Sequence, residues 1–160
     1  YDINIPEGDV LIPCDSQQIS QVLTNVLKNA SESVSARVDA EGEDGEKGYI
    51  GLTLSETGAA SGENNSREVK IVIEDNGVGL PKEDRDRLTE PYVTTRTKGT
   101  VLGLAIVKKI MEDHTGDLIL EDRGFGGASI SLVFRPGSNP QQLPAVGQEN
   151  EETEMNAHGT

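Results

Sequence analysis

The sequence has little of what several large classes of protein require. Aromatic residues make up only 3% of its 160 residues, and Cys14 is the one cysteine. A single cysteine cannot form an intramolecular disulfide, which fits a reducing compartment. No apolar run is long enough to cross a membrane, and no signal-peptide pattern is present. We therefore expect this piece of chain to be soluble.

Basic residues are also scarce. Fourteen Lys and Arg stand against 28 Asp and Glu, which gives a formal net charge of −14. Such a charge argues against nucleic acid or an anionic membrane as the main partner. It does not exclude a small anionic ligand, because a few local donors can outweigh a distant field.

The hydrophobic residues are clustered, and one cluster has helical spacing. Asp15, with Gln18 three residues later, has the form of a capping box at a helix start. A helical stripe follows, which predicts one amphipathic helix over Ser16 to Ala36. Its apolar members are Ile19, Val22, Leu23, Val26, Leu27, Ala30 and Val34. A short strand over Val10 to Ile12 is expected before this helix.

The rest of the chain alternates between strand patterns, a second helix and polar stretches. Strands are expected over 49–54, 69–75, 118–120 and 129–134, and a helix over 102–113. Asp39 to Gly48 is predicted to be a loop because it is rich in Gly, Glu and Asp. Asp75 to Gly99 is a long connection with one possible helical turn over 82–88, and such connections are usually functional or disordered.

This order of elements predicts an α+β domain over residues 1–135. We expect a two-layer α/β sandwich, in which a mixed, mostly antiparallel sheet has its helices on one face. Residues 136–160 are polar and acidic, with Pro140, Pro144 and the run from Glu149 to Glu154. We predict that this tail is disordered.

Two asparagines on the first helix are candidate ligand-binding residues. Asn25 and Asn29 are four residues apart, on one face and at the border of the apolar stripe. An asparagine offers a carbonyl oxygen that suits magnesium and an amide that can donate to phosphate. Taken alone, the pair is better explained as two polar residues at a helix edge.

The strand ending at Asp75 runs directly into Asn76-Gly77-Val78-Gly79. Strand alternation places Asp75 on the core face, where a carboxylate is costly unless a donor, such as the exocyclic amine of a purine, meets it. Gly77 and Gly79 allow a sharp turn and a close approach to a flat ligand. On this stretch alone, an ordinary turn at a strand end is an equal alternative.

The third motif, Lys98 to Leu104, is a glycine-containing loop placed before a helix. Free N–H groups and the helix dipole make such a place suitable for phosphates, and Lys98 and Arg96 add positive charge. In isolation this signal is weak.

Together, the three motifs resemble the ATP-binding catalytic domain of bacterial sensor histidine kinases. That domain belongs to the Bergerat-type family shared with gyrase B, the MutL repair proteins and a class of heat-shock chaperones. The resemblance covers Val10 to Phe134, and within the family it is greatest to nitrogen-regulation sensors of the NtrY type. The matching segments are an N box over 25–30, a first glycine box over 75–79, an F box over 88–96 and a second glycine box over 99–105.

The resemblance implies a role for each matching residue. Asn29 would bind the magnesium ion that bridges the triphosphate, with Asn25 beside it. Asp75 would bind the adenine amine, and Gly77 and Gly79 would shape the adenine pocket. A mobile lid over the phosphates would contain Thr94, Thr95, Arg96 and Lys98, and its hinge and anion-binding end would be Gly99, Gly103 and Leu104. The remaining ATP-binding residues would be Tyr92, Thr100, Val101 and Leu102.

The sequence departs from the family pattern at three places. Val101 replaces a glycine of the second glycine box, and a valine would be strained there if the position needs a positive φ. Tyr92 replaces the usual Phe of the F box. Thr115 stands where a second glycine is common, at the end of the second helix.

A fourth departure separates kinases from hydrolases. The ATP-hydrolysing relatives have a glutamate four residues before the key asparagine, where this chain has Asn25, which cannot act as a general base. Glu32 is interpreted as a solvated surface charge. His114, near a helix end, is expected to cap carbonyls or pack, and His158 lies in the tail. Neither histidine has the setting of a phosphoacceptor.

The resemblance therefore predicts a protein-histidine kinase domain that uses ATP and Mg²⁺. Its partners would be its own upstream helical dimerisation domain, which carries the acceptor histidine, and a response regulator. The fragment would be monomeric and cytoplasmic, in a parent that is a membrane-anchored sensor. Two alternatives stay open: a nucleotide-binding regulatory module impaired by Val101, and a serine kinase of the anti-sigma type.

Overall fold

The computed structural model describes residues 1–42, 45–58, 67–82, 88–89 and 100–136, with only the backbone described for Thr100 to Leu102. Its longest element is helix α1, Ser16–Glu41. The Asp15 side chain caps this helix by accepting hydrogen bonds from the N–H groups of Gln17 and Gln18, at 2.9 and 3.1 Å. These bonds satisfy two of the donors that every helix start leaves free, as the sequence predicted.

The same helix is five residues longer than the sequence predicted. It continues to Glu41 and ends at Gly42, whose φ is +71° and whose N–H bonds to the carbonyl of Val38 at 3.0 Å. Arg37 forms an ion pair with Glu41 across this last turn. The predicted loop from Asp39 was therefore wrong at its start, because exposed acidic residues continue the helix until a glycine ends it.

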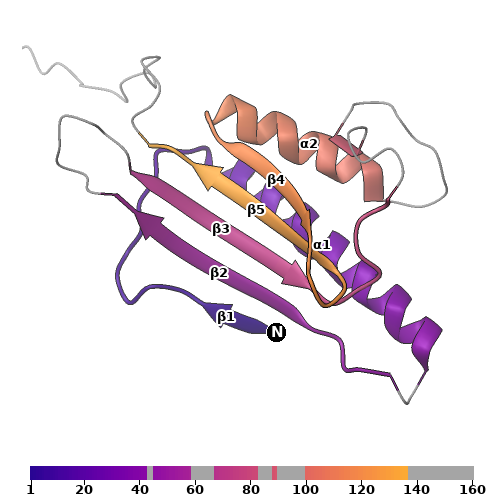
Figure 1. Ribbon diagram of the computed structural model, residues 1–160. Coiled ribbons are helices and arrows are strands. Elements are labelled where there is room, and N and C mark those ends of the chain that lie inside the picture. The colour runs from indigo at the N-terminus through magenta and orange to yellow at the C-terminus, as the bar shows by residue number, and fades with distance from the viewer. Residues whose placement is uncertain (43–44, 59–66, 83–87, 90–99, 137–160) are drawn as a thin grey trace, which may run out of the picture.

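Five strands form one sheet in the order β1-β2-β3-β5-β4 (Figure 1). They are β1 Asp2–Asn4, β2 Ile50–Thr57, β3 Glu68–Asp75, β4 Asp117–Asp122 and β5 Ala128–Phe134. The β1–β2 pair is parallel and the other pairs are antiparallel, so the sheet is mixed and mostly antiparallel. Ile50 pairs with Asp75, which places the start of β2 beside the end of β3.

The first strand of the sheet is not the predicted one. Val10 to Ile12 has no strand structure, and the strand is the exposed segment Asp2–Asn4 instead. Val10 and Ile12 pack, partly buried, against the hydrophobic core. Their apolar pattern therefore came from core packing and not from strand pairing.

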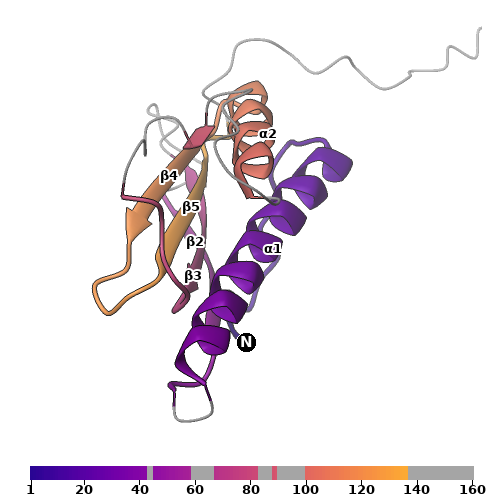
Figure 2. The same cartoon turned by 90° about the vertical axis from the view of Figure 1, so that its right-hand side faces the viewer.

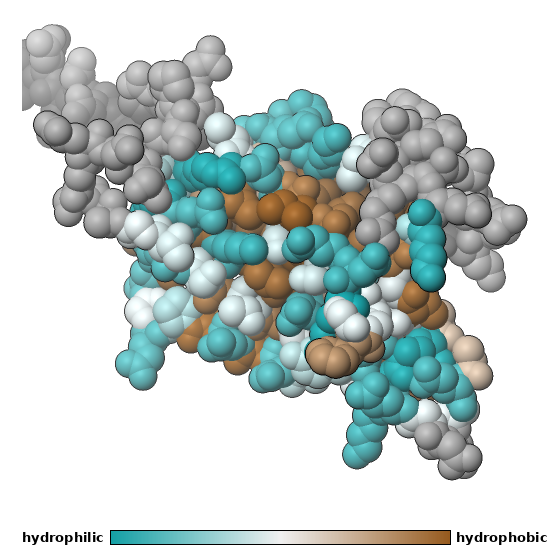
Figure 3. All heavy atoms as spheres, viewed as in Figure 1, coloured by the Kyte–Doolittle hydropathy of each residue, from teal (hydrophilic) through white to brown (hydrophobic). Residues whose placement is uncertain are grey.

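Helices α1 and α2, Thr100–Asp113, lie together on one side of the sheet (Figure 2). The core between the two layers is built from Val22 and Val26 of α1, Val107 and Met111 of α2, and inward residues of the central strands. The opposite face of the sheet is open in Figure 3, where hydrophilic and hydrophobic residues are mixed. The predicted two-layer sandwich is confirmed. No helix in the described part of the chain could span a membrane.

Helix α2 begins two residues before the predicted start and ends in a regular stop. The N–H of Gly116 bonds to the carbonyl of Met111 at 2.8 Å, and the N–H of Thr115 bonds to that of Glu112 at 3.0 Å. This is the Schellman pattern, which puts its C′ residue in the left-handed region. That residue is Thr115, with φ of +56°.

His114 joins the end of α2 to the start of α1. Its Nδ1–H donates to the carbonyl oxygen of Ile110 at 2.8 Å, and its Nε2 accepts from the N–H of Asp15 at 3.0 Å. Both ring nitrogens are used in holding the two helices, so the expectation that His114 caps carbonyls is confirmed.

Candidate functional site

Asp75 is the centre of the candidate site. It ends β3 on the core face, is only 3% exposed, and so confirms the side predicted from strand alternation. Its Oδ1 accepts from the N–H of Gly77 at 2.8 Å and from the hydroxyl of Ser33 at 3.3 Å. Burial raises the pKa of this carboxyl above its ordinary value. The N–H groups of Gly77 and Ala128, the Ser33 hydroxyl and the charge of Arg123 act in the opposite direction.

Three glycines bring the surrounding backbone close to Asp75. A Cβ atom at Gly127 would lie 1.9 Å from the carbonyl oxygen of Asp75, and one at Gly77 would lie 2.2 Å from the Ser33 Oγ. Gly79 and Gly127 have φ of +78° and +91°. Glycine is therefore needed at position 77 because α1 packs closely against it. At positions 79 and 127 a glycine is needed both for close contacts and because the backbone has a positive φ.

Asn76 is buried, and it holds the loop onto the start of β2. Its Oδ1 accepts from the N–H of Tyr49 at 2.7 Å, and its Nδ2 donates to the carbonyl oxygen of Lys47 at 2.9 Å. The Asn76 side chain thus supplies the hydrogen bonds to the backbone segment just before β2 that a paired strand would otherwise make. Asn76 is a structural residue, as the turn-forming alternative for this stretch implied.

A cavity of about 100 Å³ opens beside Asp75, between α1, the loop after β3, α2 and β5. Its polar side chains are Asp75, Asn29 and Ser33, and the rest of its wall is apolar or glycine: Ala30, Gly79, Leu80, Pro81, Leu88, Leu104, Ala128 and Ile130. Pockets that bury drug-sized ligands measure roughly 300–1,000 Å³. This cavity therefore suits one flat, mainly apolar group that carries a hydrogen-bond donor.

Asn29 of α1 lines this cavity, and Asn25 lies one turn before it on the same helix. Asn29 is 9% exposed. Within the described residues, the Nδ2 atoms of Asn25 and Asn29 are buried without a hydrogen-bond partner. Buried donors of this kind usually have a partner, so both amides are free to donate to a ligand.

Gly103 on α2 faces the same pair. A Cβ atom there would lie 3.7 Å from Asn29 Nδ2 and 3.8 Å from Asn25 Cβ. Leu104, the next residue, is buried and lines the cavity. The structure therefore brings Asn25, Asn29, Asp75, Gly79, Gly103 and Leu104 around one region, with Gly77 behind it.

The other predicted site residues are not placed by the structure. Tyr92, Thr94, Thr95, Arg96, Lys98 and Gly99 lie outside the described residues, as do the side chains of Thr100, Val101 and Leu102. The backbone of Val101 lies in α2. Helical residues have a negative φ, so valine meets no backbone strain there.

Several lining residues were not predicted from the sequence. Ser33, Leu80, Ala128 and Ile130 were missed because each reaches the cavity through long-range packing. Gly127, which lies between β4 and β5, was not predicted to contribute to the site either. Its neighbour Gly126 gave the available signal, since two successive glycines directly before a strand indicate a backbone that must turn or approach closely.

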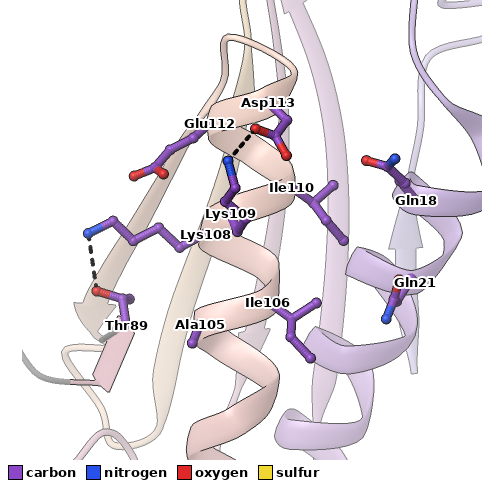
Figure 4. A pocket seen from close by; sticks show the side chains of 10 residues that line it. All are labelled: Gln18, Gln21, Thr89, Ala105, Ile106, Lys108, Lys109, Ile110, Glu112 and Asp113. Carbon is purple, nitrogen blue, oxygen red and sulfur yellow. Dashed lines mark hydrogen bonds and ion pairs between the residues drawn. The ribbon is translucent and has the colours of Figure 1, made fainter. Parts of the chain in front are cut away.

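A larger groove of about 760 Å³ lies between the outer faces of α1 and α2. Figure 4 shows Ile106 and Ile110 of α2 directed toward α1, which contributes Gln18 and Gln21. Lys109 is paired with Asp113 at 2.6 Å, and Lys108 donates to Thr89 at 3.4 Å. None of the groove's charged side chains is buried, so its chemistry differs from that of the Asp75 cavity.

Comparison with known proteins matches the same part of the chain. Residues 14–138 fit the family described as histidine kinase-, DNA gyrase B- and HSP90-like ATPases. The chain belongs to this family. Family membership and the two-layer fold therefore agree with the resemblance carried by the four sequence boxes.

The curated relatives include a nitrogen regulation protein and putative sensor histidine kinases. The chain is 47% identical over 123 residues to the nitrogen regulation protein NtrY of Azorhizobium caulinodans, covering 76% of this chain and 14% of that protein. It is 37% identical to a putative NtrY-like sensor histidine kinase of Rickettsia conorii, covering 84% and 19%. The chain thus spans less than a fifth of the length of these relatives.

Solved structures show the same fold. The catalytic domain of the histidine kinase ThkA matches with a TM-score of 0.64 and 28% identity, over 83% of this chain and 76% of that one. The mycobacterial sensor histidine kinase MprB matches with a TM-score of 0.62 and 25% identity, over 84% and 83%. The family's ATPase character supports ATP as the ligand class of the site.

Proposed function

We propose that this chain is the catalytic domain of a two-component sensor histidine kinase. It would bind ATP with Mg²⁺ and transfer the γ-phosphoryl group to a histidine on a separate helical dimerisation domain. The observation that carries the proposal is the buried carboxylate of Asp75 at the wall of a small, largely apolar cavity.

Asp75 is suited to recognising adenine. An amine on a flat aromatic ring is a donor that a buried carboxylate needs, because an ionised group out of water is costly without such partners. The apolar wall, which includes Leu80, Leu104 and Ile130, fits the faces of a purine. The cavity would hold the base alone, and the sugar and phosphates would extend toward Asn29 and Gly103.

Asn25 and Asn29 are suited to the phosphate end of the ligand. An amide oxygen is a hard, neutral ligand of the kind that Mg²⁺ accepts, and an amide N–H₂ donates to phosphate oxygens. The two unpartnered Nδ2 atoms fit this role. Asn29 would hold the ion, which would neutralise phosphate charge, and Asn25 would help to orient the triphosphate.

The site favours transfer to a protein over hydrolysis. Asn25 cannot take a proton from water at neutral pH. Glu32 is exposed and lies 3.9 Å from Lys28, on the solvent side of α1, so it does not replace a general base at the cavity. Phosphoryl transfer depends mainly on positioning and charge neutralisation, which this arrangement would supply.

The acceptor and the later partners would lie outside this chain. An imidazole nitrogen of the helical domain would attack the γ-phosphorus, the bond to the β–γ bridging oxygen would break, and ADP would leave. His114 is committed to joining α1 and α2, which supports an acceptor elsewhere. A response regulator would then receive the phosphoryl group. The domain would work in the cytoplasm, within a membrane-anchored sensor.

The first test is calorimetric titration of the chain with a non-hydrolysable ATP analogue, with and without Mg²⁺. We expect the native chain to bind the analogue in a magnesium-dependent way. Asp75→Asn, which removes the charge but keeps the shape of the side chain, should abolish binding. Asn29→Ala should remove the magnesium dependence and leave weak binding through the base. An absence of binding by the native chain would refute the nucleotide assignment.

The remaining alternatives are separated by two further measurements. Transfer of radiolabelled phosphate to the helical domain of the parent protein, supplied in trans, would exclude a purely regulatory module. Titration of Val101→Gly tests whether valine weakens the phosphate site, and the helical backbone at this residue predicts equal binding. A serine kinase of the anti-sigma type would phosphorylate a serine of its partner and leave the helical domain unlabelled.

A further inference from the structure

Ser33 occupies an unusual position for a helical serine. In a helix, serine and threonine hydroxyls commonly bond back to the carbonyl four residues earlier. Two residues of α1 do so: Ser20 donates to the carbonyl of Ser16 and Thr24 to that of Ser20, both at 2.8 Å. The Ser33 hydroxyl donates instead to Asp75 Oδ1 at 3.3 Å, across a separation of 42 residues. The Ser33 hydroxyl thus donates to a residue of the sheet and not to a carbonyl of its own helix.

The main chain of Ser33 holds the same loop. Its carbonyl oxygen accepts from the N–H of Val78 at 3.2 Å, and Gly77 packs so closely that a Cβ atom there would lie 2.2 Å from the Ser33 Oγ. Ser33 therefore contacts the loop on both sides of Gly77. These contacts fix the Asp75 carboxylate relative to α1, which also carries Asn29.

We infer that Ser33 is a positioning residue of the nucleotide site, which orients the Asp75 carboxylate so that Oδ2 is left to meet the ligand's amine. Two donors already engage Oδ1, namely the Gly77 N–H and the Ser33 hydroxyl. The Ala128 N–H also donates to the carboxylate, which leaves capacity for a further donor on Oδ2. A carboxylate oxygen has two lone pairs, so Oδ1 has no further capacity. This inference rests on the proposed function, because it takes Asp75 to be the residue that binds the base.

The hydroxyl also influences the ionisation of Asp75. Donation from Ser33 favours the charged carboxylate and lowers its pKa, against the larger effect of burial, which raises it. The charged group that faces Asp75 from the β4–β5 turn is Arg123, which also lowers the pKa. Removing the Ser33 hydroxyl should therefore raise the pKa of Asp75 further, with Arg123 unchanged.

The test combines binding with a direct titration. Ser33→Ala should weaken binding of the non-hydrolysable ATP analogue about three- to tenfold, the range expected for one lost hydrogen bond. Carboxyl-carbon NMR of the ligand-free chain should show the Asp75 pKa raised in this variant. Ser33→Thr, which keeps a hydroxyl, should restore both properties. Ser35→Ala, an exposed serine on the same helix, should change neither and controls for helix propensity.

The outcomes separate the two proposals. Native-like binding and an unchanged Asp75 pKa in Ser33→Ala would overturn the positioning role. Weaker binding with an unchanged pKa and no recovery in Ser33→Thr would also overturn it, because the effect would then be structural. If Asp75→Asn bound the nucleotide as tightly as the native chain, the proposed base contact would fail. The NMR titration would still decide whether Ser33 acts on Asp75.

Discussion

The turn between β4 and β5 contains three glycines that separate two costs of adding a side chain. A Cβ atom at Gly124 would meet no other atom within 4 Å, and this residue has no positive φ. Gly126 also has open space around it, but its φ is +95°. Gly127 has φ of +91°, and its Cβ would lie 1.9 Å from the Asp75 carbonyl oxygen. Alanine at these positions should therefore have graded effects on stability.

The expected changes in the free energy of unfolding follow from these differences. Gly124→Ala should be neutral or stabilise by about 0.4–1 kcal/mol, because alanine reduces the freedom of the unfolded chain. Gly126→Ala should destabilise by about 1–2 kcal/mol, the cost of a left-handed backbone with a Cβ. Gly127→Ala adds a steric cost of about 1–3 kcal/mol, for a total of about 2–5 kcal/mol.

Equilibrium urea denaturation measures all three variants under the same conditions. A shift in midpoint with an unchanged slope reports a change in stability. Gly127→Ala should also weaken nucleotide binding, since the backbone that must move is that of Asp75, whereas Gly126→Ala should bind as the native chain does. Equal losses of stability at Gly126 and Gly127 would refute the close approach. A larger loss at Gly124 would refute the described turn itself.

Three other changes test separate features of the fold. Thr115→Gly should stabilise the domain by about 1 kcal/mol, because its φ of +56° costs a β-branched residue more than glycine, and Thr115→Ala should gain less in the same denaturation experiment. Asp15→Ala should destabilise by about 1 kcal/mol by removing the cap of α1, with Asp15→Ser as the variant that keeps most of it. Asp75→Asn should gain stability relative to the native chain as pH rises from the ordinary pKa of 3.8 through the raised folded-state pKa of Asp75. Burial raises the folded-state pKa of Asp75 above its ordinary value of 3.8, so the folded state holds the proton longer and the cost of the buried charge appears only as pH rises through that window. A constant difference between the two proteins across this range would contradict the raised pKa.

The order of the elements was predictable because the hydrophobic patterns are strong. Alternation in β3 even gave the side on which Asp75 lies, since successive strand residues must face opposite ways. Ends of elements were less predictable. The end of α1 depends on Gly42 and on an Arg37–Glu41 pair, and exposed acidic residues gave no sign of a helix before it.

The site was predictable only where its residues lie in compact motifs. Asn25, Asn29 and Asp75 could be named because their local spacing determines which face they occupy. Ser33 and Gly127 could not, because each acquires its role from a partner far away in the sequence. A hydroxyl that leaves its own helix to bond with Asp75, and a glycine pressed against the backbone of β3, are products of the tertiary fold.

The candidate nucleotide site is also marked by side chains that make the folded state less stable. Folding alone disfavours a carboxylate at Asp75, since its burial raises its pKa, and it disfavours unpartnered amides at Asn25 and Asn29. Residues that break the rules of folding in one place are expected at functional sites, where a ligand compensates for the cost. A base amine at Asp75 and phosphate oxygens at the two amides would supply these missing partners together. One nucleotide would therefore account for three separate unfavourable features, whereas an ordinary turn at the end of β3 supplies the Gly77 N–H to Asp75 and leaves both amides without partners.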